Sequence, residues 1–262
     1  MQHMDDADVG GYWDHNADTW TELARAGYDV HRDLVNTPAF LALLPDVAGG
    51  SGLDLGCGEG HNTRLLARRG ARMTAIDLAG RFLAAAQAEE RRQPLGIRYV
   101  HANAAALPFT DAVFDFAAAF MSLMDMADLP AVLAEVCRVL RPGGFLQFSI
   151  EHPCAVTPHS RWVNDEHGRP VARTIGGYFD QAPHVDTWLF GAAPDEVRRG
   201  RQPFRIPRFP RTLGTWLNAI VSSGMVIEAA GEPYAGDAAI ARSPGLDQTR
   251  IAPLFLHLRC RV

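Results

Sequence analysis

A glycine turn between a short apolar segment and a helical segment restricts the fold of this chain. Residues 53–55 (Leu-Asp-Leu) have the pattern of a buried strand, residues 56–60 (Gly-Cys-Gly-Glu-Gly) form the turn, and residues 62–69 have a helical pattern. Glycines at a strand-to-helix turn permit a positive φ and let a ligand approach the main chain closely. In open α/β sheets such turns lie at the carboxyl ends of the strands, where ligands bind. The turn therefore predicts an α/β sheet with a ligand site beside it.

Strand and helix patterns alternate through most of the chain. Helical patterns cover residues 12–44, 81–92, 129–140 and 212–223, and strand patterns cover residues 72–77, 97–100, 113–119, 145–150, 225–230 and 254–259. This alternation predicts a doubly wound, Rossmann-like α/β fold whose sheet is mostly parallel.

The same pattern divides the chain into four parts. We expect an N-terminal helical cap over residues 1–48, a cofactor-binding core over residues 49–150, an insertion over residues 151–210, and the C-terminal part of the core over residues 211–262. The insertion shows no regular pattern and follows the fifth strand. Structureless insertions of this length are usually functional or disordered, and its many aromatic residues argue against disorder. We expect a lid over the substrate, with the interface of a homodimer as the alternative.

The composition excludes several classes of protein. The formal net charge is −5 over 262 residues, and no long cationic stripe is present, which argues against nucleic acid as a partner. All 25 basic residues are arginine, so a lysine Schiff base is excluded. The four cysteines form no CxxC pair, and we predict no metal site. Six arginines between positions 198 and 211 are interpreted as a solvated loop face.

Nothing in the sequence indicates a membrane partner. The first residues are polar and acidic, and no apolar run approaches the roughly 20 residues that a membrane-spanning helix needs. We therefore expect a cytoplasmic protein.

Charges around the glycine turn favour a cationic ligand over a dinucleotide. His61 stands where the third glycine of a G-x-G-x-x-G fingerprint would fall, and Asp54 and Glu59 put negative charge where a pyrophosphate would sit. Asp77 ends the second strand at the usual position of a partner for a ribose diol. S-adenosylmethionine carries an ammonium, a sulfonium and a ribose diol, so it fits these residues better than NAD does.

Five segments carry recognisable motifs: residues 53–60, 75–77, 102–109, 114–115 and 138–144. Together they resemble the motifs of class I S-adenosylmethionine-dependent methyltransferases, in particular the type 11 group that includes ubiquinone/menaquinone-biosynthesis-like enzymes. The resemblance covers residues 49–150 well. It implies a seven-stranded sheet whose last strand is antiparallel, with S-adenosylmethionine as the cofactor.

The resemblance also implies where the cofactor binds. The expected contacts are Tyr12, Asp54, Gly56, Cys57, Gly58, Asn62, Asp77, Leu78, Asn103, Ala104 and Phe120. Tyr12 is chosen over its neighbours Trp13 and Trp20 as the aromatic face toward the sulfonium. Asn103 departs from the family, which usually has an aspartate facing the adenine. Residues 123–126 (Leu-Met-Asp-Met) stand where the family often has a histidine pair, so no role of that pair can be transferred.

Two residues are candidates for a catalytic base. His152 follows the fifth strand, where an imidazole could take a proton from a hydroxyl or amine; the alternative is a histidine that orders the loop. Asp125 is the second candidate, although a solvated turn residue is the simpler interpretation. We expect transfer of the methyl group to an oxygen or nitrogen of a small molecule, most simply a secondary metabolite. The alternatives are an RNA or protein methyltransferase and a non-catalytic protein that binds S-adenosylmethionine.

Overall fold

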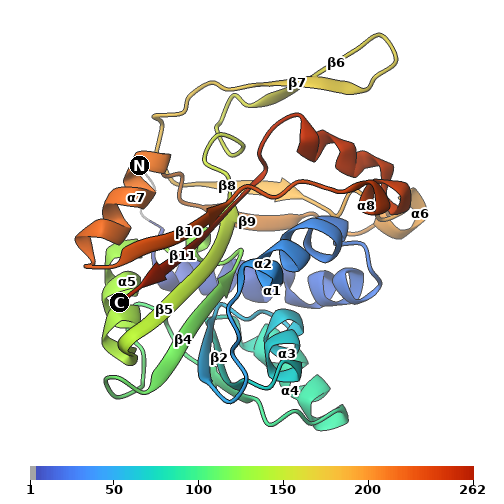
Figure 1. Cartoon of the computed structure of the whole chain (residues 1–262). Helices are drawn as coiled ribbons and strands as arrows, with labels where there is room; N and C mark the ends of the chain where they lie inside the picture. The colour runs from blue at the N-terminus through green and yellow to red at the C-terminus, as the bar shows by residue number, and fades with distance from the viewer. Residues whose placement is uncertain (1–3) are drawn as a thin grey trace.

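Seven strands form one mixed sheet at the centre of the computed structural model, which describes residues 4–262 (Figure 1). They are β1 (Ser51–Leu55), β2 (Arg72–Asp77), β3 (Arg98–His101), β4 (Phe114–Phe120), β5 (Leu140–Glu151), β10 (Val226–Gly231) and β11 (Phe255–Arg261). Their order is β10-β11-β5-β4-β1-β2-β3, and β11 runs antiparallel to both of its neighbours. The predicted Rossmann-like seven-stranded fold is confirmed, including its antiparallel last strand.

Helices cover both faces of the sheet because successive residues of its inner strands point to opposite sides. In β4, Ala117 packs into one apolar layer and Phe116 into the other. The first layer contains residues of α5 (Leu129–Val139) and α7 (Leu213–Ser222), and the second contains residues of α2 (Thr37–Leu43) and α3 (His61–Arg68). A strand that is buried on both faces needs a near-continuous apolar run, which is the pattern that the sequence shows here.

The N-terminal part folds back over the sheet. It consists of α1 (Asp6–Arg25), η1 (Arg32–Asn36), which is one turn of π-helix, and α2. A capping box begins α1, because the Asp5 side chain accepts from the backbone of Asp8 and the Asp8 side chain accepts from that of Asp5. α1 then packs against α4 (Gly80–Arg92) and against the insertion. Residues 1–3 of the expected cap lie outside the described residues.

The insertion after β5 has more regular structure than its sequence indicated. It contains the hairpin β6 (Arg161–Asn164) and β7 (Pro170–Thr174), the antiparallel pair β8 (His184–Trp188) and β9 (Phe204–Arg208), and the short helix α6 (Asp195–Arg198). In Figure 1 the β6–β7 hairpin projects from the body, whereas β8 and β9 lie across it. The expectation of no regular structure was wrong because the apolar partners of β8 and β9 are on α1, far away in the sequence. Trp20 of α1 packs against Trp188, Phe190 and Phe204.

Two short helices between β10 and β11 were also not predicted. They are α8 (Asp237–Arg242) and η3 (Pro244–Arg250), and Leu246 of η3 packs with Val35 and Phe255 over the end of β11. No helix within residues 4–262 is long and apolar enough to cross a membrane.

Candidate functional site

A cavity of about 700 Å³ lies at the carboxyl ends of the central strands. Its floor is the glycine turn after β1, and its walls come from α1, η1, β8, β9 and η3. Small-molecule sites have volumes of roughly 300–1,000 Å³. The elements that enclose this cavity come from both ends of the chain and from the insertion, so the site forms only when these parts pack together.

The end of β2 holds the glycine turn in place. Gly56 and Gly58 have φ values of 71° and 55°, and a Cβ at Gly56 would lie 2.6 Å from the Cβ of Ser122. The backbone N–H of Gly58 donates to Oδ2 of Asp77 at 2.7 Å, and that of Gly56 donates to the carbonyl of Ile76 at 2.9 Å. Glycine is therefore required at position 56 both by its backbone conformation and by a close neighbour.

Asp77 lines the cavity with both carboxylate oxygens partly free. Oδ2 accepts from Gly58, and Oδ1 accepts from the backbone N–H of Ala79 at 2.8 Å. Burial raises the pKa of this carboxyl group. Each carboxylate oxygen can accept about two hydrogen bonds, so each oxygen retains room for one hydroxyl of a vicinal diol. The residues present thus fit a ribose at this end of the cavity, and Leu78 lines the same end.

A carboxylate from α1 reaches Asn103 in the cavity wall. Nδ2 of Asn103 donates to Oδ2 of Asp6 at 2.7 Å, while its Oδ1 accepts from the backbone N–H of Ala105 at 2.8 Å. Asp6, Asn103 and Ala104 all line the cavity beyond Asp77. Sequence reasoning missed Asp6, because no local pattern connects it to a residue 97 positions away.

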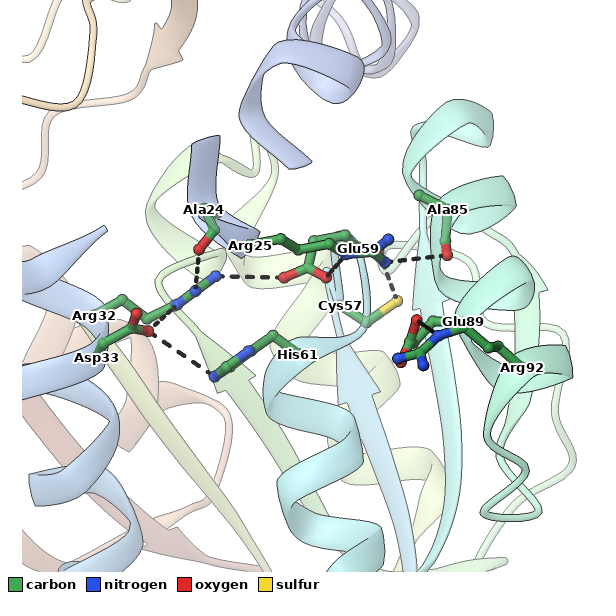
Figure 2. Close-up of polar contacts among 11 residues, drawn as sticks. Ala24, Arg25, Arg32, Asp33, Cys57, Glu59, His61, Ala85, Glu89 and Arg92 are labelled. Carbon is green, nitrogen blue, oxygen red and sulfur yellow. Dashed lines mark hydrogen bonds and ion pairs between the residues drawn. The ribbon is translucent and has the colours of Figure 1, made fainter. Parts of the chain in front are cut away.

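The two carboxylates flanking the turn do not act as the sequence suggested. Asp54 is outside the cavity lining: its Oδ2 accepts from Oγ1 of Thr63 at 2.5 Å, and burial raises its pKa to about 7. Glu59 lines the cavity, but it pairs with Arg25 at 3.2 Å and with Arg32 at 3.3 Å (Figure 2). The charge of Glu59 is therefore balanced by these two arginines.

An excess of carboxyl groups still surrounds the cavity as a whole. The six acidic residues in its lining are Asp6, Asp29, Glu59, Asp77, Asp125 and Glu151, against three arginines, Arg32, Arg173 and Arg208. A cationic ligand is thus favoured by this set of residues, most of which cannot be recognised from the turn alone.

Tyr12 is not where the sequence predicted it. Its ring faces Arg205, whose guanidinium carbon lies 4.9 Å from the ring centroid, and it is not part of the cavity lining. Trp13 and Trp20 line the cavity instead. Adjacent residues of a helix point about 100° apart. Tyr12 therefore lies on a different face of α1 from its neighbour Trp13, and the prediction was wrong by one position.

The other expected cofactor contacts lie in the cavity wall. Cys57 and Asn62 line it at the glycine turn, and burial raises the pKa of the Cys57 thiol. Oδ1 of Asn62 accepts from Oγ1 of Thr37 at 2.9 Å. Phe120 lines the cavity at the end of β4, where its ring centroid lies 3.8 Å from that of Phe40.

The structure does not bring His152 to the cavity. Its Nδ1 accepts from the backbone N–H of Cys154 at 3.2 Å, and its Nε2 lies 3.0 Å from Oε1 of Glu232. Burial lowers the pKa of this imidazole. His152 is absent from the cavity lining, so it orders the chain after β5, which is the structural alternative named above.

Asp125 is a buried carboxyl group in the cavity wall, not a solvated turn residue. It lies in η2 (Leu123–Asp125), is only 5% exposed, and has its pKa raised by burial to about 7. Its Oδ1 lies 3.6 Å from the guanidinium of Arg208 and has no hydrogen-bond partner among residues 4–262. Arg208 also pairs with Glu151 at 2.6 Å and with Asp186 at 3.1 Å. The interpretation of the arginine-rich segment as a solvated face is thus wrong for Arg208, because three carboxylates surround it in the fold.

Two comparisons relate this chain to known methyltransferases. A family model described as a methyltransferase domain matches residues 53–148. The crystal structure of an S-adenosylmethionine-dependent methyltransferase from Mesorhizobium loti has a TM-score of 0.69 and 32% identity, covering 86% of this chain and 96% of that one.

Curated relatives match over shorter stretches. A malonyl-[acyl-carrier protein] O-methyltransferase of Pectobacterium atrosepticum is 35% identical over 124 residues, which is 47% of each chain. The O-methyltransferase cnsE of Penicillium expansum is 32% identical over 176 residues, which is 60% of this chain and 63% of that protein. The matches therefore span about half to two thirds of the length of these relatives.

Proposed function

This chain belongs to the class I S-adenosylmethionine-dependent methyltransferases, and we propose that it methylates an oxygen or nitrogen of a small molecule, a secondary metabolite. The observation that carries the proposal is the buried Asp125 in the wall of the cavity. The cavity has walls formed by α1, β8–β9 and η3, and its volume of about 700 Å³ is in the range of small-molecule sites, so a small ligand is favoured over a folded RNA or protein.

The chain's own residues divide the cavity into two ends. At the β2–β3 end, Asp77 would hold the ribose, and the main chain of the glycine turn would lie along the cofactor. When bound, S-adenosylmethionine supplies an electrophilic methyl group on a positively charged sulfur. At the other end, Asp125, Glu151 and Arg208 face the acceptor beside apolar side chains of the lid such as Trp188 and Ile206. These apolar side chains exclude water and hold the acceptor in line.

Asp125 is suited to accept a proton from the acceptor. A general base works best when its pKa lies near the working pH, and burial places the pKa of Asp125 at about 7. Arg208 stabilises the ionised carboxylate from 3.6 Å. The three carboxylates around Arg208 disfavour another carboxylate as the acceptor, so a hydroxyl or amine is favoured over the acidic group that the name malonyl-[acyl-carrier protein] O-methyltransferase suggests for that relative.

The test begins with methyl transfer from labelled S-adenosylmethionine to a metabolite panel and, in parallel, to RNA and protein extracts. We expect label in hydroxyl- or amine-bearing metabolites; label only in RNA or protein would overturn the proposal.

With an acceptor in hand, Asp125→Asn should lower kcat by about 10²–10⁴-fold and leave the Kd of S-adenosylhomocysteine nearly unchanged. In the parent enzyme, kcat should fall as the pH drops below about 7, because Asp125 is then protonated. The variant should lack this limb of the pH profile. Asp111→Asn, at an exposed loop position, is the matched control. An unchanged pH profile in Asp125→Asn would show that Asp125 is not the base.

A further inference from the structure

Asn36 is buried with its whole amide group unpaired. The residue is 2% exposed, and neither Nδ2 nor Oδ1 has a hydrogen-bond partner among residues 4–262. A buried amide without partners destabilises the folded state, so such a group in a cavity wall points to a partner that arrives with a ligand. Asn36 is part of that wall.

The backbone around Asn36 is also unusual. The N–H of Thr37 donates to the carbonyl of Arg32, which closes the wide turn of the π-helix η1. Single π-turns are rare and occur frequently at functional sites. They insert one residue into a helix and so change which side chains face the interior.

The position of η1 identifies the end of the cavity that Asn36 serves. Thr37 bonds to Asn62 directly after the glycine turn, and Phe40, further along α2, stacks on Phe120 at the end of β4. Asp77 ends β2, and β1 separates β2 from β4 in the sheet. If the ribose of the cofactor lies at Asp77, the amino acid end of the cofactor therefore extends across the glycine turn toward Asn36.

We propose that Asn36 binds the α-amino acid end of S-adenosylmethionine. This end offers one carboxylate and one ammonium, and the Asn36 amide offers one unpaired donor and one unpaired acceptor. After a rotation of the side chain toward the ligand, Nδ2 donates to the carboxylate and Oδ1 accepts from the ammonium.

The neighbouring charged residue is already engaged. Arg32 donates to Glu59, to Asp33 and to the carbonyl of Ala24. Of the two η1 residues that line the cavity, Arg32 is therefore paired within the protein, whereas the Asn36 amide is not.

The test compares two ligands that differ in this end. Calorimetry should measure the Kd of S-adenosylhomocysteine and of 5′-methylthioadenosine, which lacks the amino acid, for the parent protein and for Asn36→Leu. We expect the variant to bind S-adenosylhomocysteine at least about tenfold more weakly and 5′-methylthioadenosine within about twofold. Asn218→Leu, at an exposed position of α7, is the matched control and should change neither value.

A second readout separates this role from a structural one. Leucine has the same branching and number of heavy atoms as asparagine and needs no hydrogen bonds, and the cavity beside it has room for its larger methyl groups, so Asn36→Leu should keep or raise the Tm without ligand. It should also reduce the gain in Tm on adding S-adenosylhomocysteine. A lowered Tm with both ligands weakened equally, or an unchanged ratio of the two Kd values, would overturn the proposal. If Asn36→Leu does not fold, Asn36→Asp provides the same comparison, because it removes the donor and places a negative charge beside the carboxylate.

Discussion

Asp54 and Asp125 are both buried carboxyl groups, and burial raises the pKa of each to about 7. They differ in what surrounds them. Asp54 lies beneath the glycine turn, where Thr63 donates to one oxygen, whereas Asp125 lies in the cavity wall beside Arg208. The same desolvation therefore acts on a carboxyl group outside the cavity lining at Asp54, and at Asp125 on one in the cavity wall, where we propose that it serves as the base.

The raised pKa of Asp54 should make stability depend on pH. In the unfolded chain this carboxyl has a pKa of about 3.9, so the folded state binds the proton more tightly. The resulting stabilisation is fully present below about pH 4 and is lost as the pH rises through about 7, a difference of at most ~4 kcal/mol. Asp54→Asn removes this group, so its free energy of unfolding should fall less between pH 5 and pH 8 in urea titrations than that of the parent. Asp111→Asn should keep the parental slope, and an equal slope in Asp54→Asn would contradict the assignment.

Glu59 connects the glycine turn to the N-terminal helices. It pairs with Arg25 at the end of α1 and with Arg32 of η1, and Arg25 also donates to the carbonyl of Ala85 in α4 (Figure 2). Arg32 is mostly buried, so its pairing contributes more than an exposed ion pair would. These contacts hold α1 and η1 over the cavity.

Glu59→Gln should loosen this connection. The substitution removes both ion pairs while keeping the size of the side chain, and we expect a loss of roughly 1–3 kcal/mol in the local stability of α1. Hydrogen exchange of residues 6–25 should become faster, and S-adenosylhomocysteine should bind more weakly. Glu22→Gln is the control: Glu22 also lies on α1, and its substitution removes an exposed ion pair with Arg201 of the insertion. Equal protection of α1 in Glu59→Gln and the parent would show that Glu59 does not hold the helix.

An aromatic cluster joins α1 to the insertion. Trp20 packs against Trp188, Phe190 and Phe204 with ring centroids 4.8–5.5 Å apart. This cluster is separate from the two apolar layers of the sheet. The insertion therefore has its own core, which α1 shares with the strands β8 and β9.

Phe204→Ala should detach the insertion from α1. Phe204 is 1% exposed, and truncation of a buried phenylalanine costs about 3–5 kcal/mol. We expect a lower Tm and faster proteolysis within residues 151–210. Phe179→Ala, at an 83% exposed position of the same insertion, should change neither. Unchanged protease resistance in Phe204→Ala would mean that the cluster does not hold the insertion against α1.

The amino-acid sequence alone was enough to predict the seven-stranded sheet and the glycine turn, and to place Asp77 at the end of β2, where we expect the ribose. These features depend on local patterns: the apolar period of each strand, the positive φ that glycine permits, and the end of β2 at a carboxylate. The short strands of the insertion could not be predicted, because the apolar partners of β8 and β9 are side chains of α1.

Which side chains reach the cavity could not be predicted, because it depends on how distant segments pack together. The fold brought Asp6 to Asn103, surrounded Arg208 with three carboxylates, and turned His152 away toward Glu232. Burial and pairing depend on residues that are distant in the chain, and these two factors set whether a carboxyl group is a solvated turn residue or, like Asp125, a candidate base with a pKa of about 7.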